Sequence, residues 1–406
     1  MENSKVRKIE LLSPAGDLQR CKMAIRYGAD AVYLGGRSFS LRSRASNFTN
    51  EDIAEACRYA KEYGARIHVT VNMIPHEEDL PGLEEYLKAL EAMGVTAIIA
   101  ASPAVIQCAK RVAPKLEVHL STQMSVTNSD AAKFLKETLG IDRVVLAREC
   151  SMPEVKKITS ELDVETEAFI HGGMCVNYSG RCTLSNRMTL RDANRGGCAQ
   201  SCRWNYELFD GDTSVSNERL FTMGSKDLFA AKHIADLIKA GVSSLKIEGR
   251  MKTEYYVSAV VSAYRNLIDD LYEHDLELSD ERLLEHQKEI MRAENREVWD
   301  GFYDNPDAVH SIIYNNESNA SVSQEFLAKV VSYNKEEGTC VIETRNPFVL
   351  EEVEVLSPHK EGRSFQIEWM KTEDGEMLER SKTPMVELTI PIPFEVEKED
   401  IIRRAR

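Results

Sequence analysis

The sequence has no apolar stretch long enough to cross a bilayer, and its first residues lack the hydrophobic core and cleavage site of a signal peptide. We therefore expect a cytoplasmic protein that does not enter a membrane. Disulfides are rare in that reducing compartment, so the nine cysteines do not indicate a disulfide framework. Each must instead be a buried thiol or a ligand.

Negatively charged residues outnumber positively charged ones. The sequence contains 51 Lys and Arg against 66 Asp and Glu, which gives a formal net charge of −15. This balance argues mildly against a nucleic-acid ligand, because phosphate binding depends on Lys and Arg. The acidic residues are spread along amphipathic helical patterns such as 84–91 and 269–289, where they form solvated surface. A single local basic patch therefore remains compatible with the composition.

Several well-known motifs are also missing. No G-x-G-x-x-G turn or G-x-x-x-x-G-K-S/T loop follows a predicted strand, which removes the main support for a nucleotide-binding fold. The sequence has no H-E-x-x-H helix, no G-x-S-x-G turn and no Cys–His pair with a recognisable local signature. The familiar protease classes are therefore not indicated.

What residues 1–300 do contain is an alternation of short β-branched runs and amphipathic helical patterns, which is typical of a parallel sheet with crossover helices. Eight such strands fit an α/β fold of the TIM-like (β/α)8 barrel type better than an open doubly wound sheet. The predicted strands are 8–12, 31–34, 66–72, 97–101, 116–121, 143–147, 165–171 and 244–248.

The pattern changes near the end of the chain. A segment rich in Asn, Ser and Asp predicts a linker at 301–324. Beyond it, at 325–406, the apolar residues alternate with period two between turn signals, which predicts a small C-terminal antiparallel β-barrel domain. Its predicted strands are 326–333, 340–344, 352–356, 364–369 and 385–390.

A Gly- and Cys-rich insertion at 172–204 interrupts the barrel pattern after the seventh strand. It contains the motif C-x6-C-x15-C-x3-C, formed by Cys175, Cys182, Cys198 and Cys202. In a barrel the insertion would lie at the C-terminal mouth, where active sites are built. Four thiols in one loop are typical of an iron–sulfur cluster or of zinc. Zinc sites usually bring paired C-x2-C hooks, so the spacing favours the cluster over a zinc staple.

The insertion also carries five arginines and only one acidic residue, Asp192. The arginines are Arg181, Arg187, Arg191, Arg195 and Arg203. They could balance the charge of the thiolates or bind RNA phosphates, and spacing does not separate these interpretations. The remaining five cysteines are interpreted as lone buried thiols.

Polar residues follow most of the predicted strands, at the positions where a barrel gathers its active site. Arginines at such positions suit a carboxylate or phosphate, which they hold through paired hydrogen bonds. Together these residues favour a small anionic ligand, although each alone could equally form a structural ion pair or a helix cap. They are Ser13, Asn72, Gln123, Arg148, Glu149, His171, Glu248 and Arg250.

The residues of the insertion resemble the signature of peptidase family U32, and within it the TrhP branch of tRNA hydroxylation proteins. The matching runs are Phe169-Ile-His-Gly-Gly-Met-Cys175, Tyr178-Ser-Gly-Arg-Cys182 and Asp192-Ala-Asn-Arg-Gly-Gly-Cys198-Ala-Gln-Ser-Cys202-Arg-Trp204. Shorter matches, such as 12–16 and 246–250, spread the resemblance over all eight predicted strands, and the tail is similar more loosely.

The resemblance implies a [4Fe–4S] cluster on the four cysteines of the insertion and hydroxylation of RNA or of ubiquinone precursors without molecular oxygen. The TrhP branch makes 5-hydroxyuridine at the tRNA wobble position with a prephenate-derived donor, which is a dicarboxylate. Arg42, Arg148 and Arg250 would then bind the donor, and Glu149 or Glu248 would transfer a proton. tRNA would be the macromolecular partner, and a paralogous partner subunit is left open.

One departure from the family stands near residue 300. Family members carry Ser-His-Arg before a Thr-Gly-Phe turn, whereas this chain has Glu294-Asn295-Arg296 and only the arginine is kept. Two other functions stay open at this point. The chain could be a peptidase of unassigned mechanism, as the family label says, or a non-enzymatic RNA-binding accessory protein whose loop is stapled by a metal.

Overall fold

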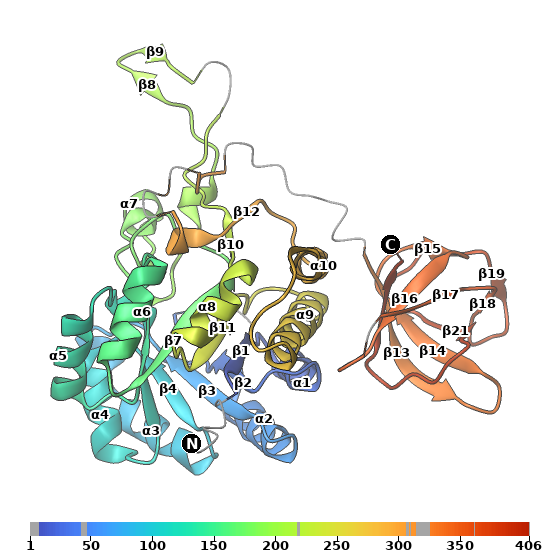
Figure 1. Ribbon diagram of the computed structural model, residues 1–406, viewed down its shortest axis with the longest axis horizontal. Coiled ribbons are helices and arrows are strands. Elements are labelled where there is room, and N and C mark those ends of the chain that lie inside the picture. Colours follow the sequence, from blue (N-terminus) through green and yellow to red (C-terminus); the bar gives the residue numbers. More distant parts are fainter. Residues whose placement is uncertain are drawn as a thin grey trace.

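The computed structural model describes residues 8–41, 47–216, 220–305, 308, 310–313, 325–360 and 362–405. Within these residues a β/α barrel and a C-terminal β domain lie side by side, and a thin hairpin projects from the barrel (Figure 1). The predicted fold class is confirmed. No described helix is long and apolar enough to cross a membrane.

Eight parallel strands form the barrel. They are β1 (Glu10–Pro14), β2 (Ala31–Gly35), β3 (Arg66–Val71), β4 (Ala97–Ala100), β5 (Glu117–Leu120), β6 (Arg143–Val145), β7 (Glu165–Gly172) and β11 (Ser244–Ile247). β11 pairs with both β1 and β7, which closes the cylinder. Every predicted strand is present, with its ends within two residues of the prediction.

The helices around the barrel begin and end at ordinary capping residues. Thr49 and Asp52 form a capping box at the start of α2, and Gly140 ends α5 in the left-handed conformation. Helices α1 to α6, α8 and α9 bury an apolar face toward the strands, whereas α10 packs on α9, and this burial is the main source of their stability. The helices are α1 (Leu18–Arg26), α2 (Asn50–Glu62), α3 (Leu83–Ala92), α4 (Pro103–Val112), α5 (Ser129–Leu139), α6 (Met152–Glu161), α8 (Ile234–Lys239), α9 (Glu254–Glu273) and α10 (Asp280–Met291).

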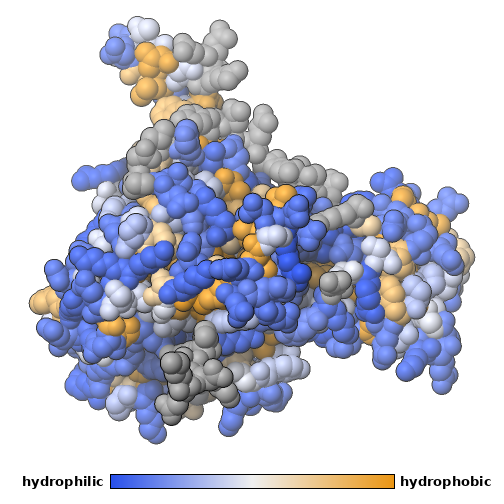
Figure 2. Space-filling model, in the orientation of Figure 1, coloured by the Kyte–Doolittle hydropathy of each residue, from blue (hydrophilic) through white to orange (hydrophobic). Residues whose placement is uncertain are grey.

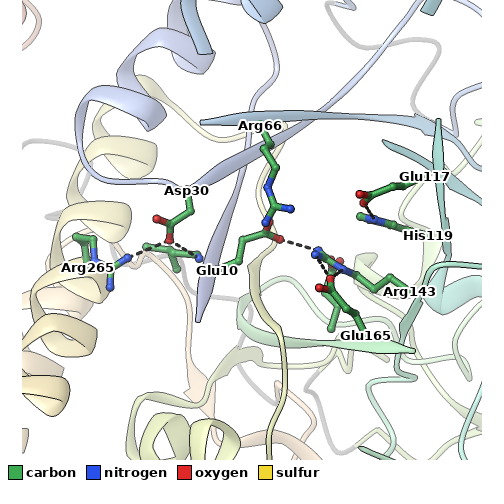
Figure 3. A network of polar contacts seen from close by, with 10 residues as sticks. Glu10, Asp30, Arg66, Glu117, His119, Arg143, Glu165 and Arg265 are labelled. Carbon is green, nitrogen blue, oxygen red and sulfur yellow. Dashed lines mark hydrogen bonds and ion pairs between the residues drawn. The ribbon is translucent and has the colours of Figure 1, made fainter. Parts of the chain in front are cut away.

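The inside of the barrel is unusually polar, and the sequence of β3 shows why. It reads R-I-H-V-T-V, so that Ile67, Val69 and Val71 face the helices while the polar residues between them face inward. At the N-terminal end of the barrel, the buried guanidinium of Arg143 lies 2.6 Å from Glu10 and 3.0 Å from Glu167 (Figure 3 shows the surrounding network). The end opposite the mouth is therefore closed by ion pairs rather than by apolar side chains.

Barrel packing continues past residue 300, into part of the predicted linker. β10 (Asp227–Phe229) pairs with β7 in the antiparallel sense, and β12 (Val298–Trp299) pairs with β10. Tyr303 is buried, and its hydroxyl donates to the carbonyl of Phe169 at 2.6 Å. Residues 314–324 lie outside the described residues.

After β7 the chain does not return directly to a helix of the outer ring. The insertion forms the short α7 (Leu184–Thr189), and the chain then makes the hairpin of β8 (Phe209–Asp210) and β9 (Thr213–Ser214). This hairpin stands away from the barrel and carries hydrophobic side chains on an otherwise mostly hydrophilic surface (Figure 2).

The C-terminal domain is an eight-stranded antiparallel sheet that curls around its own apolar core. Its strands are β13 (Phe326–Asn334), β14 (Thr339–Thr344), β16 (Glu352–Leu356), β17 (Arg363–Gln366), β18 (Met370–Lys371), β19 (Met377–Leu378), β21 (Glu387–Pro391) and β22 (Ile401–Arg404), with β15 (Phe348–Val349) and β20 (Arg380–Ser381) as a separate pair. The Tyr27 hydroxyl donates to the carbonyl of Leu356 at 2.9 Å, and Arg26 lies 2.7 Å from buried Asp400. These contacts attach the domain to the barrel.

Candidate active site at the mouth of the barrel

A cavity of about 410 Å³ opens at the C-terminal ends of the barrel strands. One wall is made by the loops that follow β3, β5, β6 and β11, and the other wall is the Cys-rich insertion. Six of the predicted mouth residues line it, namely Asn72, Gln123, Arg148, Glu149, Glu248 and Arg250. Arg42, also predicted to bind the ligand, lies outside the described residues.

All four cysteines of the insertion line this same cavity. Burial raises the pKa of the Cys202 thiol, the thiols of Cys175, Cys198 and Cys182 raise it further, and Arg203 opposes them, which places these three thiols near Cys202. Among the described residues, no three of these sulfur atoms lie within 4.8 Å of each other. Tetrahedral zinc, with Zn–S bonds of ~2.3 Å, would bring them to about 3.8 Å. The arrangement is therefore wider than a zinc knuckle.

Glu149 fixes the insertion to the barrel. Its two carboxylate oxygens accept hydrogen bonds from the backbone N–H of Ser179 at 2.9 Å and from the Ser179 hydroxyl at 2.8 Å. Gly180 follows with φ +77°, and a Cβ there would lie 2.2 Å from the carbonyl oxygen of Gln123. Because both oxygens of Glu149 are engaged in holding the loop, Glu248 is the stronger candidate for proton transfer.

We expect Glu149→Ala to loosen the insertion, because it removes two hydrogen bonds to a charged acceptor, each contributing about 1.5–3 kcal/mol. Limited proteolysis within residues 172–204 should accelerate at least tenfold. Glu154→Ala is a matched control, since Glu154 accepts the same pair of hydrogen bonds from Ser151 at the exposed start of α6. Equal cleavage rates in the two variants would show that Glu149 does not anchor the loop.

The barrel side of the cavity is cationic. The Arg148 guanidinium stacks 3.9 Å from the centre of the Phe169 ring and lies 3.6 Å from the Glu248 carboxylate. Arg250 is buried, and its Nη1 donates to the hydroxyls of Ser40 at 3.1 Å and Thr70 at 3.0 Å. The charged residues of the lining are Arg148, Arg191, Lys246 and Arg250 against Glu149 and Glu248. Four cations against two carboxylates suit an anionic ligand.

Lys246 was missed by the sequence analysis. It is the inward-facing residue of β11, with its ammonium 2.6 Å from Glu167 and 4.6 Å from the centre of the Tyr33 ring. Burial alone would raise the pKa of Glu167, yet the charges of Lys246 and Arg143 lower it to about 2. The only signal in the sequence was a lysine between two apolar residues of a predicted buried strand.

His171, expected at the mouth, does not line the cavity. The pairing of β7 with β11 shifts register between Phe169 and His171. This bulge turns the imidazole away from the interior of the barrel. There it is fully buried, with Nε2 2.8 Å from the Glu294 carboxylate and Nδ1 3.2 Å from the Tyr264 hydroxyl. Glu294 is the first residue of the segment that departs from the family pattern, so that segment helps to hold β7 in place.

The five arginines of the insertion do not form a single collar. Arg181 and Arg187 are exposed, whereas Arg195 is paired with Glu78 at 2.7 Å and Asp79 at 2.8 Å. Arg203 lies 3.6 Å from buried Asp227. Arg191 is the member of this group that lines the cavity. The five arginines that were predicted to bind RNA therefore lie in separate environments.

The fold and the cavity define a TIM-like barrel protein with a thiol-walled mouth and an appended β domain. The chain belongs to peptidase family U32: the model of this family matches residues 16–312, and the model of the U32 C-terminal domain matches residues 322–403.

Curated relatives of this chain carry different names. The chain is 42% identical over 407 residues to tRNA hydroxylation protein P1 of Bacillus subtilis, covering 98% of this chain and 96% of that protein. It is 40% identical over 266 residues to a 23S rRNA 5-hydroxycytidine synthase of Escherichia coli, covering 66% of this chain and 40% of that protein. It is 33% identical over 312 residues to a collagenase of Porphyromonas gingivalis, covering 73% and 74%.

Proposed function

We propose that this chain is a cytoplasmic RNA-modifying enzyme that hydroxylates the wobble uridine of tRNA to 5-hydroxyuridine without molecular oxygen. The observation that carries the proposal is one cavity with four thiols on one wall and an arginine–glutamate set on the other. The name of the Bacillus relative supports hydroxylation of tRNA, and that of the Escherichia relative supports hydroxylation of an RNA pyrimidine.

The donor set fits a [4Fe–4S] cluster. Four soft thiolates meet in one cavity, at a spacing wider than tetrahedral zinc allows. The side-chain amide of Asn177 donates to the sulfur of Cys182 at 3.1 Å, a contact of the kind that tunes a cluster. Bound to Cys175, Cys182, Cys198 and Cys202, the cluster would supply electron-transfer chemistry beside the substrates.

The barrel wall would hold the donor, a prephenate-derived dicarboxylate. Arg148 and Arg250 offer charged donors for two carboxylates. Glu248, which accepts from the Tyr33 hydroxyl at 3.2 Å, would move the proton at the reacting base. The target uridine would be unstacked into the cavity, which a single-stranded anticodon loop permits at low cost.

Mass spectrometry of tRNA nucleosides tests the proposal. A deletion strain should lose 5-hydroxyuridine and its derivatives, and a plasmid copy of the gene should restore them. Unchanged nucleosides in the deletion strain would remove this function. The name of the Porphyromonas relative makes peptide release from collagen the parallel assay: release by the purified chain, with nucleosides unchanged, would favour a peptidase.

Arg148→Gln should raise the KM for the dicarboxylate donor about tenfold with a smaller change in kcat, because it removes one charge-assisted contact present in both the bound and the reacting state. Arg181→Gln, at an exposed position of the insertion outside the cavity lining, is the control. Steady-state kinetics with varied donor would measure the effect. An unchanged KM in Arg148→Gln would place the donor elsewhere.

A further inference from the structure

A second cavity, of about 680 Å³, adjoins the barrel mouth. It lies between residues 38–40, the segment 79–86 at the start of α3, and residues 190–197 of the insertion. Arg191 lines both this cavity and the thiol-walled one, so residues 190–197 form a partition between them. A ligand in the first cavity would therefore be separated from the second cavity by the side chain of Arg191.

Side chains that line the second cavity carry buried polar atoms without partners. Among the described residues, the hydroxyl of Tyr86 and the Nε of Arg191 make no hydrogen bond, and neither does the Nε of Arg195. Arg195 forms ion pairs with Glu78 and Asp79, whereas no ion pair to Arg191 occurs among the described residues. Buried polar groups are nearly always satisfied in native proteins, so this set indicates a ligand with acceptor atoms.

The same cavity offers aromatic faces and carries backbone strain. The rings of Phe39 and Tyr86 lie 5.5 Å apart on its wall. Phe39 has φ 59° and Leu190 has φ 55°, left-handed conformations that non-glycine residues rarely adopt and that cluster at ligand sites. Leu190 stands at the rim and is 92% exposed. Aromatic rings beside an arginine are the usual platform for a single-stranded base and its phosphate, and Arg191 forms no ion pair within the described part of the chain.

We propose that the second cavity binds the nucleotide next to the target uridine, with Arg191 on the phosphate that joins the two. This inference rests on the proposed function, because it assumes that the first cavity holds an unstacked base of an RNA strand. The neighbouring base would lie against the rings of Tyr86 and Phe39. Two adjacent nucleotides would be splayed on either side of residues 190–197.

Binding of a synthetic anticodon stem-loop, measured against salt concentration, tests the phosphate contact. Arg191→Ala should weaken binding about tenfold and reduce the slope of log K against log salt by about one, the signature of one lost phosphate contact. Arg58→Ala is the matched control, since Arg58 is exposed on α2, lines neither cavity and is not among the arginines predicted to bind RNA. Indistinguishable affinities and slopes in the two variants would overturn the inference.

Abasic substitution tests the base contact. Abasic sites are placed in turn at the two nucleotides that flank the target uridine. At one of the two positions, the loss of the base should weaken binding to the wild-type chain roughly tenfold, as expected for one stacked base. The penalty should vanish in Tyr86→Ala and persist in Tyr86→Phe, which keeps the ring. Equal penalties in all three proteins would overturn the inference while leaving the proposed function intact. If the wild-type chain binds no anticodon stem-loop, the inference falls together with the proposed substrate.

Discussion

Replacing Cys198 with alanine should abolish both the visible absorption of the anaerobically purified protein and the formation of the hydroxylated nucleoside. A [4Fe–4S] cluster needs all four thiolates. Even the loss of a residue that only hydrogen-bonds to a metal ligand lowers metal affinity or activity roughly 10–100-fold. We expect activity to fall by at least that factor. Iron content and nucleoside mass spectrometry of the complemented deletion strain measure the two effects.

Cys57→Ala is the matched control for this substitution. Cys57 is a buried thiol on α2, packed in the barrel core away from the cavity lining. It should keep its colour and its activity at a small cost in stability. A colourless wild-type protein that contains one zinc would contradict the cluster, and it would favour the accessory-protein alternative instead.

Glu167→Gln should destabilise the barrel by about 3–5 kcal/mol, the range observed when one partner of a buried ion pair is removed. The Glu167 carboxylate lies between the Lys246 ammonium at 2.6 Å and the Arg143 guanidinium at 3.0 Å, with no exposed surface of its own. Without it both cations stay buried with less compensation. Urea unfolding measures the loss, and a change below about 1 kcal/mol would contradict it.

The same carboxylate sets an acid dependence. Its pKa is about 2 in the folded chain against the ordinary value of 4.5, so its contribution is complete above pH 4.5 and is lost as the pH falls toward 2. Between those limits the wild-type chain should lose stability more steeply than Glu167→Gln. Glu165→Gln is the control, because Glu165 pairs with the same arginine but is partly exposed. Parallel pH profiles for wild type and Glu167→Gln would contradict the assignment.

The barrel could be predicted because its strands and helices have different hydrophobic periods. The strands bury short β-branched runs, and the helices that cover them have one apolar face. The order of strands and helices can therefore be predicted from short windows of the sequence. β22 was not predicted as a strand, although Ile401 and Ile402 are fully buried in it. Its four residues are too few for a periodic pattern, and pairing with β13 and β16 defines it.

Prediction of the site was more uneven. The residues after β3, β5, β6 and β11 meet in one cavity because parallel strands bring their C-terminal ends to one rim. The outward turn of His171 depends on a bulge in the pairing of β7 with β11, which no local pattern encodes. The ion pairs of Arg195 and Arg203 depend likewise on residues more than twenty positions away along the chain.

The sequence by itself determined the eightfold alternation, the four thiols in one insertion and the arginines at strand ends, since each is a local pattern of residue types. Only the tertiary structure decided which of those side chains share a space. It assigned Glu149 to the loop, directed His171 into the core, and made Arg191 the partition between two cavities. The physical reason is that burial, register and ion pairing are relations between distant segments, and they exist only once the barrel has closed.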